Sequence, residues 1–147
     1  MKLFLTTLIT TLFLTGCFGA VTTSTLSCTI TEQEADGLES NSTMDIDFES
    51  ETPSFLRMES VIQMASEEEA EMSGNMMSAM MGEEIDYVTY DFSVDGANFT
   101  MIIEADIAGM MEAEGTDPSI TFEDELDFTL TRTELKNQLE EEGWQCR

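Results

Sequence analysis

Two runs of alternating apolar and polar residues, on either side of Asp95-Gly96, constrain the fold more than any other part of the chain. Residues 84–94 and 97–107 both follow the period of two that is typical of a half-buried β-strand. An Asp-Gly pair between such runs favours a two-residue type I′ turn, because this pair tolerates the positive φ angles that the turn requires. The sequence therefore predicts a β-hairpin over residues 84–107.

Three earlier segments also have strand patterns. Residues 26–31 are rich in β-forming side chains, and residues 55–64 form a less regular run of the same kind. Residues 42–51 alternate more strictly and place acidic side chains on one face. The opposite face of this segment is apolar and consists of Met44, Ile46 and Phe48. These segments predict an antiparallel meander with one buried and one solvated face.

Two segments have the signals of an α-helix. Ser66 is a typical N-cap residue, and the three glutamates after it lie in the first turn, where the helix dipole favours negative charge. Gly82 should end this first helix. Thr131 and Glu134 fit the capping-box pattern at the start of a last helix, which should end at Gly143. The chain thus predicts a central helix and a C-terminal helix.

The segments between the hairpin and the last helix are less regular. Residues 108–115 are expected to form a short helical turn, and residues 120–130 an irregular strand or a loop. The elements together predict an α+β fold, an antiparallel sheet of about five strands packed by a central helix and a C-terminal helix. Residues 27–147 should form this single domain.

The start of the chain has the pattern of an export signal. Lys2 supplies a positive charge, residues 3–14 are mostly Leu, Ile and Phe, and small residues then lead to Cys17. The apolar run is shorter than the roughly 20 residues that a transmembrane helix needs. We therefore expect a removable signal peptide rather than a membrane-spanning helix.

The end of this signal predicts a lipid anchor. Leu14-Thr15-Gly16-Cys17 is similar to the lipobox of bacterial lipoproteins, which implies that residues 1–16 are removed and that Cys17 is the lipid attachment residue. Residues 17–26 would then be a flexible tether, because Gly, Ala, Ser and Thr dominate them. The open alternative is a plain secretory signal that is cut after Ala20.

Two cysteines remain once Cys17 carries lipid. Cys28 lies at the start of the folded part and Cys146 is the penultimate residue. In an oxidising compartment an even number of cysteines favours a disulfide, here between Cys28 and Cys146, although two free thiols remain the alternative. No CxxC spacing and no histidine is present to activate a thiolate.

The charge of the chain is strongly negative. The sequence has 31 acidic against five basic residues, a formal net charge of −26. Such a surface repels nucleic acid and anionic lipid head groups, so we expect no nucleic-acid partner. A solvated acidic surface is the plain interpretation, and cation binding is the alternative.

Two groups of side chains could hold a cation. Met72, Met76 and Met80 recur every four residues, which suits either core packing or, since thioethers are soft ligands, a Cu(I) site. The acidic clusters are Asp45, Asp47, Glu49 and Glu51, and Glu123, Asp124, Glu125 and Asp127. They match no calcium-loop pattern. Core packing for the methionines and a solvated face for the carboxylates are the interpretations that we prefer, so no metal-ligating residue is assigned.

Catalytic patterns are missing from the sequence. It contains no histidine, no Gly-x-Ser-x-Gly motif, no Gly-rich phosphate loop and no zinc pattern. Carboxylate pairs at a suitable separation would occur by chance in so acidic a chain. We therefore expect no enzyme, no catalytic residue and no cofactor.

The order of these elements resembles a known family. The lipobox, the meander, the central helix and the Asp-Gly hairpin are similar to those of the small YehR-like lipoproteins of bacteria. Some members of that family end as this chain does, with Gly143-Trp144-Gln145-Cys146-Arg147, and have a partner cysteine near the mature start, here Cys28. The family is of unknown function, and the resemblance implies fold and location. We expect a lipid-anchored, non-catalytic binding or envelope-associated module outside the cytoplasm, with the membrane and an envelope protein as partners; soft-metal or divalent cation sequestration is the alternative.

Overall fold

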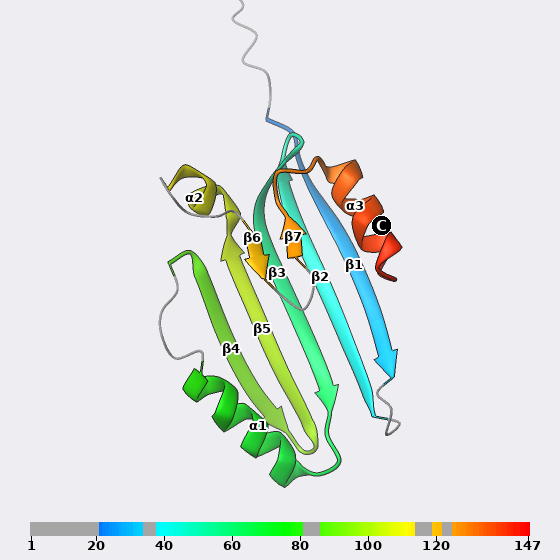
Figure 1. The fold of residues 1–147 in the computed structure, drawn as a ribbon, viewed down its shortest axis with the longest axis vertical. Coiled ribbons are helices and arrows are strands. Elements are labelled where there is room, and N and C mark those ends of the chain that lie inside the picture. Colours follow the sequence, from blue (N-terminus) through cyan, green and yellow to red (C-terminus); the bar gives the residue numbers. More distant parts are fainter. Residues whose placement is uncertain (1–20, 34–37, 81–85, 114–118, 122–124) are drawn as a thin grey trace, which may run out of the picture.

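The computed structural model describes residues 21–33, 38–80, 86–113, 119–121 and 125–147. Its centre is an antiparallel sheet of six strands in the order β4-β5-β3-β2-β1-β8 (Figure 1). These strands are β1 Thr23–Gln33, β2 Glu39–Glu49, β3 Thr52–Gln63, β4 Val88–Asp95, β5 Asn98–Asp106 and β8 Gln145–Cys146. The remaining elements are α1 Glu67–Met80, α2 Ile107–Glu112, α3 Arg132–Glu141, and the short paired strands β6 Ser119–Thr121 and β7 Glu125–Asp127.

The predicted α+β class and antiparallel sheet are confirmed, whereas the strand count was too low. The sixth strand is β8, which pairs with β1 at the edge of the sheet. It is only two residues long, so it has no alternation that a sequence pattern could detect. The first strand also begins earlier than predicted, at Thr23. Residues 23–26, which we assigned to the tether, therefore belong to the sheet, and Leu26 is fully buried.

The β4–β5 hairpin is confirmed, but its turn lies one residue later than predicted. Asp95 pairs with Asn98, so Gly96 and Ala97 form the loop. Gly96 has a φ of +59° and Ala97 has a negative φ. A positive φ at the first central residue alone is the pattern of a type II′ turn rather than the predicted type I′.

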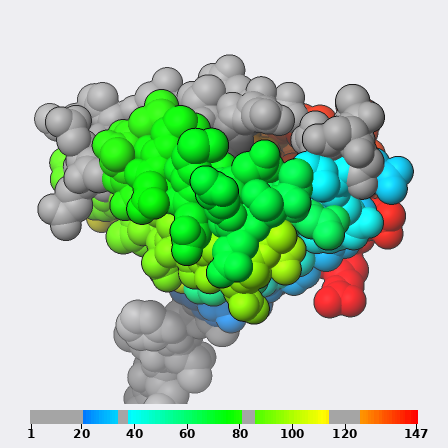
Figure 2. Space-filling model, turned by 90° about the horizontal axis from the view of Figure 1, so that it is seen from below, coloured from blue at the N-terminus to red at the C-terminus, as the bar shows by residue number. Residues whose placement is uncertain are grey.

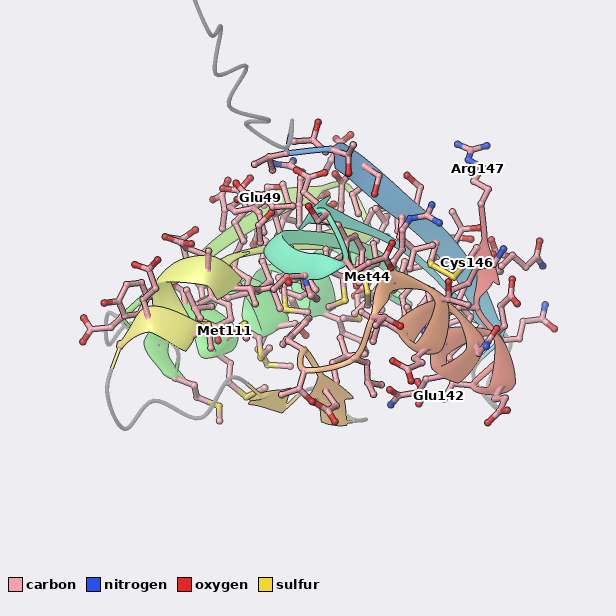
Figure 3. The ribbon with its side chains drawn as sticks, turned by 90° about the horizontal axis from the view of Figure 1, so that it is seen from above. Met44, Glu49, Met111, Glu142, Cys146 and Arg147 are labelled. Carbon is pink, nitrogen blue, oxygen red and sulfur yellow. A yellow bond between two sulfur atoms is a disulfide. The ribbon has the colours of Figure 1, made fainter. Side chains whose placement is uncertain are left out.

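One face of the sheet carries the core. Met44, Ile46 and Phe48 of β2 point inward as predicted, and all three are buried. Their neighbours across the sheet include Leu26 on β1 and Leu56 on β3, which are also fully buried. Figure 3 shows the helices and the β6–β7 pair below the sheet. The opposite face, called the outer face below, has no described helix or strand over it.

The last helix is positioned by the predicted capping box. The Glu134 backbone N–H donates to the Thr131 hydroxyl, and the Thr131 N–H donates to the Glu134 carboxylate over 3.0 Å. Hydrogen bonds from the Thr131 hydroxyl and N–H lower the pKa of Glu134. Leu135 and Leu139, which are four residues apart on one side of α3, are fully buried. Residues 107–112 form the predicted short helix, α2, with Ile107 and Met110 in the core.

The central helix is confirmed, but the prediction of its buried face was wrong. We expected Met72, Met76 and Met80 to pack on the sheet, yet their exposed fractions are 65%, 56% and 73%. The helix contacts the hairpin through small residues instead, with Ala70 fully buried and Gly74 against Val94. A Cβ at Gly74 would lie only 3.3 Å from Val94 Cγ2, so the close approach of α1 selects small side chains.

Candidate functional site

A groove on the inner face of the sheet is the principal candidate site. It lies between α1 and α3 and has a volume of about 400 Å³. Met44 of β2 and Met58 of β3 lie on its floor, Leu139 and Trp144 form the side next to α3, and Met77 reaches it from α1. Ligand pockets of this size are typically lined by apolar side chains with a few polar groups. We call this site the inner groove.

Small side chains at paired positions create the depression. Ser42 of β2 and Ser60 of β3 face each other in the register of the sheet, between Ile30 and Met101. The row above it is filled by Met44 and Met58, so the floor drops where serines replace long side chains. The inner groove is therefore a consequence of which residues the register aligns.

The serine pair is a polar group in an apolar floor. The two Oγ atoms lie 2.8 Å apart, and Ser60 is only 6% exposed. Each hydroxyl carries one proton and two acceptor positions, and their mutual hydrogen bond uses one of the two protons. The pair can thus offer both a donor and acceptors to a bound molecule.

The charges around the inner groove are negative. Glu32 of β1 and Glu142 at the end of α3 line it, and none of its described lining residues is basic. Glu142 is labelled in Figure 3, on the α3 side of the molecule below the sheet. Coulomb repulsion at such a rim disfavours an anionic ligand and favours a neutral or cationic one.

The methionines of α1 form a second candidate, because they are exposed. Met72, Met76 and Met80 lie on one side of the helix, and the Cα atoms of one methionine and the next are about 6 Å apart along the helix axis. Figure 2 shows α1, in green, at the molecular surface. Flexible thioether side chains at this spacing can converge on a soft cation such as Cu(I).

The acidic clusters do not converge on a metal site in the described part of the chain. Asp45, Asp47 and Glu49 are exposed on the outer face, as the alternation predicted. Asp47 accepts a hydrogen bond from Thr25. In the residues that the structure describes, no group of three or more His, Cys, Asp or Glu side chains is placed to hold a metal ion.

The second cluster falls mostly outside the described residues, since Glu123 and Asp124 are not among them. Asp127 accepts hydrogen bonds from the hydroxyl and the backbone N–H of Thr129, at 2.6 and 2.9 Å. Both bonds lower the pKa of its carboxyl, because they stabilise the charged form. The Asp127 carboxylate therefore stabilises the turn after β7.

The remaining site residues are the cysteines. The structure places Cys28 and Cys146 in register on β1 and β8, with their sulfur atoms at a bonding distance of 1.99 Å. The yellow bond beside Cys146 in Figure 3 is this disulfide. Cys17 and the whole expected signal peptide lie outside the described residues.

One feature of the sequence indicates the inner groove. On the inner side of β2 the residues change from Phe48, Ile46 and Met44 to Ser42 and Ser40. This loss of large apolar side chains at one end of an alternating strand indicates a space on the inner face of the sheet that the side chains of β2 do not fill. Its partner, Ser60 on β3, could be identified only from the register.

Comparisons of the chain with protein-family models, curated protein sequences and solved structures found no match. Among the described residues, no helix is both long and apolar enough to cross a membrane.

Proposed function

We propose that the protein is a lipid-anchored, non-catalytic binding module of the bacterial cell envelope, similar to the YehR-like lipoproteins. Its ligand would be a mainly apolar molecule with a neutral or cationic head, held in the inner groove. The observation that carries this proposal is the depression over Ser42 and Ser60, open between α1 and α3. The pattern at residues 14–17 supports the anchor.

The lining of the groove defines the ligand chemistry. Methionine side chains on the floor are flexible and adapt to irregular apolar surfaces, so they suit an alkyl or ring system. Glu32 and Glu142 complement a positive head, and the half-buried Trp144 ring adds a face that attracts cations. A fatty acid carboxylate would meet two like charges here.

Matched amphiphiles test this proposal on residues 18–147, which keep every described element and omit the acylated cysteine. We expect dodecyltrimethylammonium, below its micellar concentration, to bind about tenfold more tightly than dodecanoate in titration calorimetry, a difference of roughly 1.4 kcal/mol. Ser60→Leu fills the depression and should weaken the cationic ligand by about tenfold or more.

Ser24→Leu is the control, because Ser24 is exposed and does not line the groove. It should leave the affinity unchanged. Thermal unfolding establishes that both variants are folded. A folded Ser60→Leu variant that binds like the wild type would refute the inner groove as the site.

A second function, soft-metal binding, is favoured by the exposure of the α1 methionines. We expect the protein to bind one Ag(I), a stable substitute for Cu(I), in native mass spectrometry. Met76→Leu removes the central thioether at nearly constant volume and should weaken this binding by about tenfold.

Met110→Leu makes the same change at a buried position and should leave metal binding intact. If Met76→Leu and Met110→Leu bind Ag(I) equally, the α1 methionines are not the ligands.

A further inference from the structure

The strand β4 is an uncovered edge of the sheet. It pairs with β5 on one side only, and no other strand in the described part of the chain pairs with it. In an antiparallel ladder every second residue directs its N–H and C=O away from the partner strand. β4 therefore presents a row of backbone donors and acceptors, which is the template that an added strand recognises.

A second groove, the edge groove, runs along this strand. It has a volume of about 580 Å³ and is lined by the β4 residues 90–94 and by Glu71, Gly74, Asn75 and Ser78 of α1. Successive strand residues point to opposite faces of a sheet. A groove that is lined by five consecutive residues must therefore follow the edge of β4 rather than either face.

We propose that an extended, basic segment of a partner protein binds in the edge groove and adds to β4 as a further strand. A free sheet edge with a helix beside it is an arrangement that supports β-strand addition, in which backbone hydrogen bonds give affinity and side-chain pockets give specificity. At about 3.3 Å per residue, the five β4 residues of the groove match a segment of about five residues, so a hexapeptide covers its whole length.

Charge complementarity identifies the partner as basic. Glu71 and Asp91 line the edge groove, and none of its described lining residues is basic. Burial raises the pKa of the Tyr90 phenol, which is therefore neutral and adds no charge to the groove.

The basic residues of the described chain lie elsewhere. Arg132, Lys136 and Arg147 belong to the part of the chain at the opposite edge of the sheet. Arg57 is paired with Glu104 on the outer face.

The two sides of the groove define an alternating peptide. Phe92 and Val94 point to the inner side, where Phe92 stacks with Phe99 at a ring-centre distance of 6.0 Å. Asp91 and Ser93 point to the outer side. A strand beside them would place apolar residues toward Phe92 and Val94 and Lys or Arg residues toward Asp91. A second copy of this chain fits poorly, because Glu71 and Asp91 would face their own like charges.

Synthetic peptides test this proposal with the lipidated protein in phosphatidylcholine vesicles, whose zwitterionic surface attracts basic peptides weakly. We expect Lys-Val-Lys-Val-Lys-Val, capped at both ends, to bind about tenfold or more tightly than Glu-Val-Glu-Val-Glu-Val. N-methylation of alternate backbone amides in one of the two registers should weaken binding by a similar factor, because strand addition needs those N–H groups.

Charge reversal in the protein locates the site. Asp91→Lys and Glu71→Lys should each weaken the lysine peptide by about tenfold, whereas Asp45→Lys and Glu49→Lys, the same change on the outer face, should have less than about a threefold effect. Hydrogen exchange should show slower exchange in β4 when the peptide is bound. No binding, equal effects of the two variant pairs, or full affinity of both N-methylated peptides would overturn the proposal, as would dimers formed without peptide. Because these variants leave the inner groove unchanged, amphiphile binding reports separately on the proposed function.

Discussion

Cys28→Ala together with Cys146→Ala is expected to lower the free energy of unfolding by about 4 kcal/mol. The two residues are 118 positions apart, so the disulfide closes nearly all of the folded chain into one loop. Without it the unfolded chain gains conformational freedom, while the folded state loses little. Two backbone hydrogen bonds between Ser27 and Arg147, at 2.9 and 3.3 Å, still hold β8 on β1.

Urea denaturation followed by the fluorescence of Trp144, the single tryptophan, measures this effect. With a typical dependence of 1–3 kcal/mol per molar urea, the midpoint should fall by about 2 M. Reduction of the wild-type protein keeps both sulfur atoms, of which that of Cys28 belongs to a buried residue, and should produce nearly the same shift. The double variant is the control for the reductant and should not respond to it. A loss of less than about 1 kcal/mol on reduction would contradict the prediction.

Cys17→Ala is expected to abolish lipid attachment. In the lipobox pattern the lipid is attached to the sulfur atom of the cysteine, and alanine offers no substitute. In the wild type, intact mass spectrometry should show a chain that starts at Cys17 and carries acyl groups. More than one acyl chain is needed for stable anchoring, so the wild type should carry at least two. The variant, which lacks the attachment residue, should lose all of the added mass and all palmitate label.

Cys28→Ala is the matched control for the anchor, because it removes a cysteine that lies outside the pattern at residues 14–17. It should keep the full lipid mass and label. A wild-type chain that starts at Val21 without acyl groups would contradict the anchor and support a plain secretory signal. Equal lipid mass on the Cys17→Ala variant would contradict the assignment of the residue.

The two proposed grooves have the same sign of charge and different recognition chemistry. Glu32 and Glu142 border the inner groove, whose apolar floor selects by shape and hydrophobicity. Glu71 and Asp91 border the edge groove, where backbone hydrogen bonds are the main recognition element. Added salt should therefore weaken the basic peptide more than the amphiphile, since exposed charges are screened while apolar burial is not.

Local patterns in the sequence predicted most of the elements. Met44, Ile46 and Phe48 alternate with acidic residues because a strand directs successive side chains to opposite faces, and all three are buried. Thr131 and Glu134 interact with each other within one helical turn, so their capping box was evident in the sequence. The positive φ at Gly96 likewise depends on one residue and its neighbours.

The face of α1 could not be predicted in this way. Both Ala70 with Gly74 and Met72 with Met76 repeat at helical spacing, so the helix had two possible contact sides. Hydrophobicity favoured the methionines. The short distance between α1 and the hairpin decided for the small residues, and that distance is a property of the packed structure.

The sequence by itself determined the strand faces, the starts of α1 and α3, the hairpin and the acidic character of the surface, because each depends on residues that are close together in the chain. The predicted end of α1 at Gly82 lies outside the described residues. Only the tertiary structure decided that Ser42 meets Ser60, that β8 adds a sixth strand beside β1, and that β4 is left as an edge next to α1. These features depend on the register and order of strands that are distant in sequence. Both grooves arise from such long-range pairing, so the candidate sites could be found only in the folded chain.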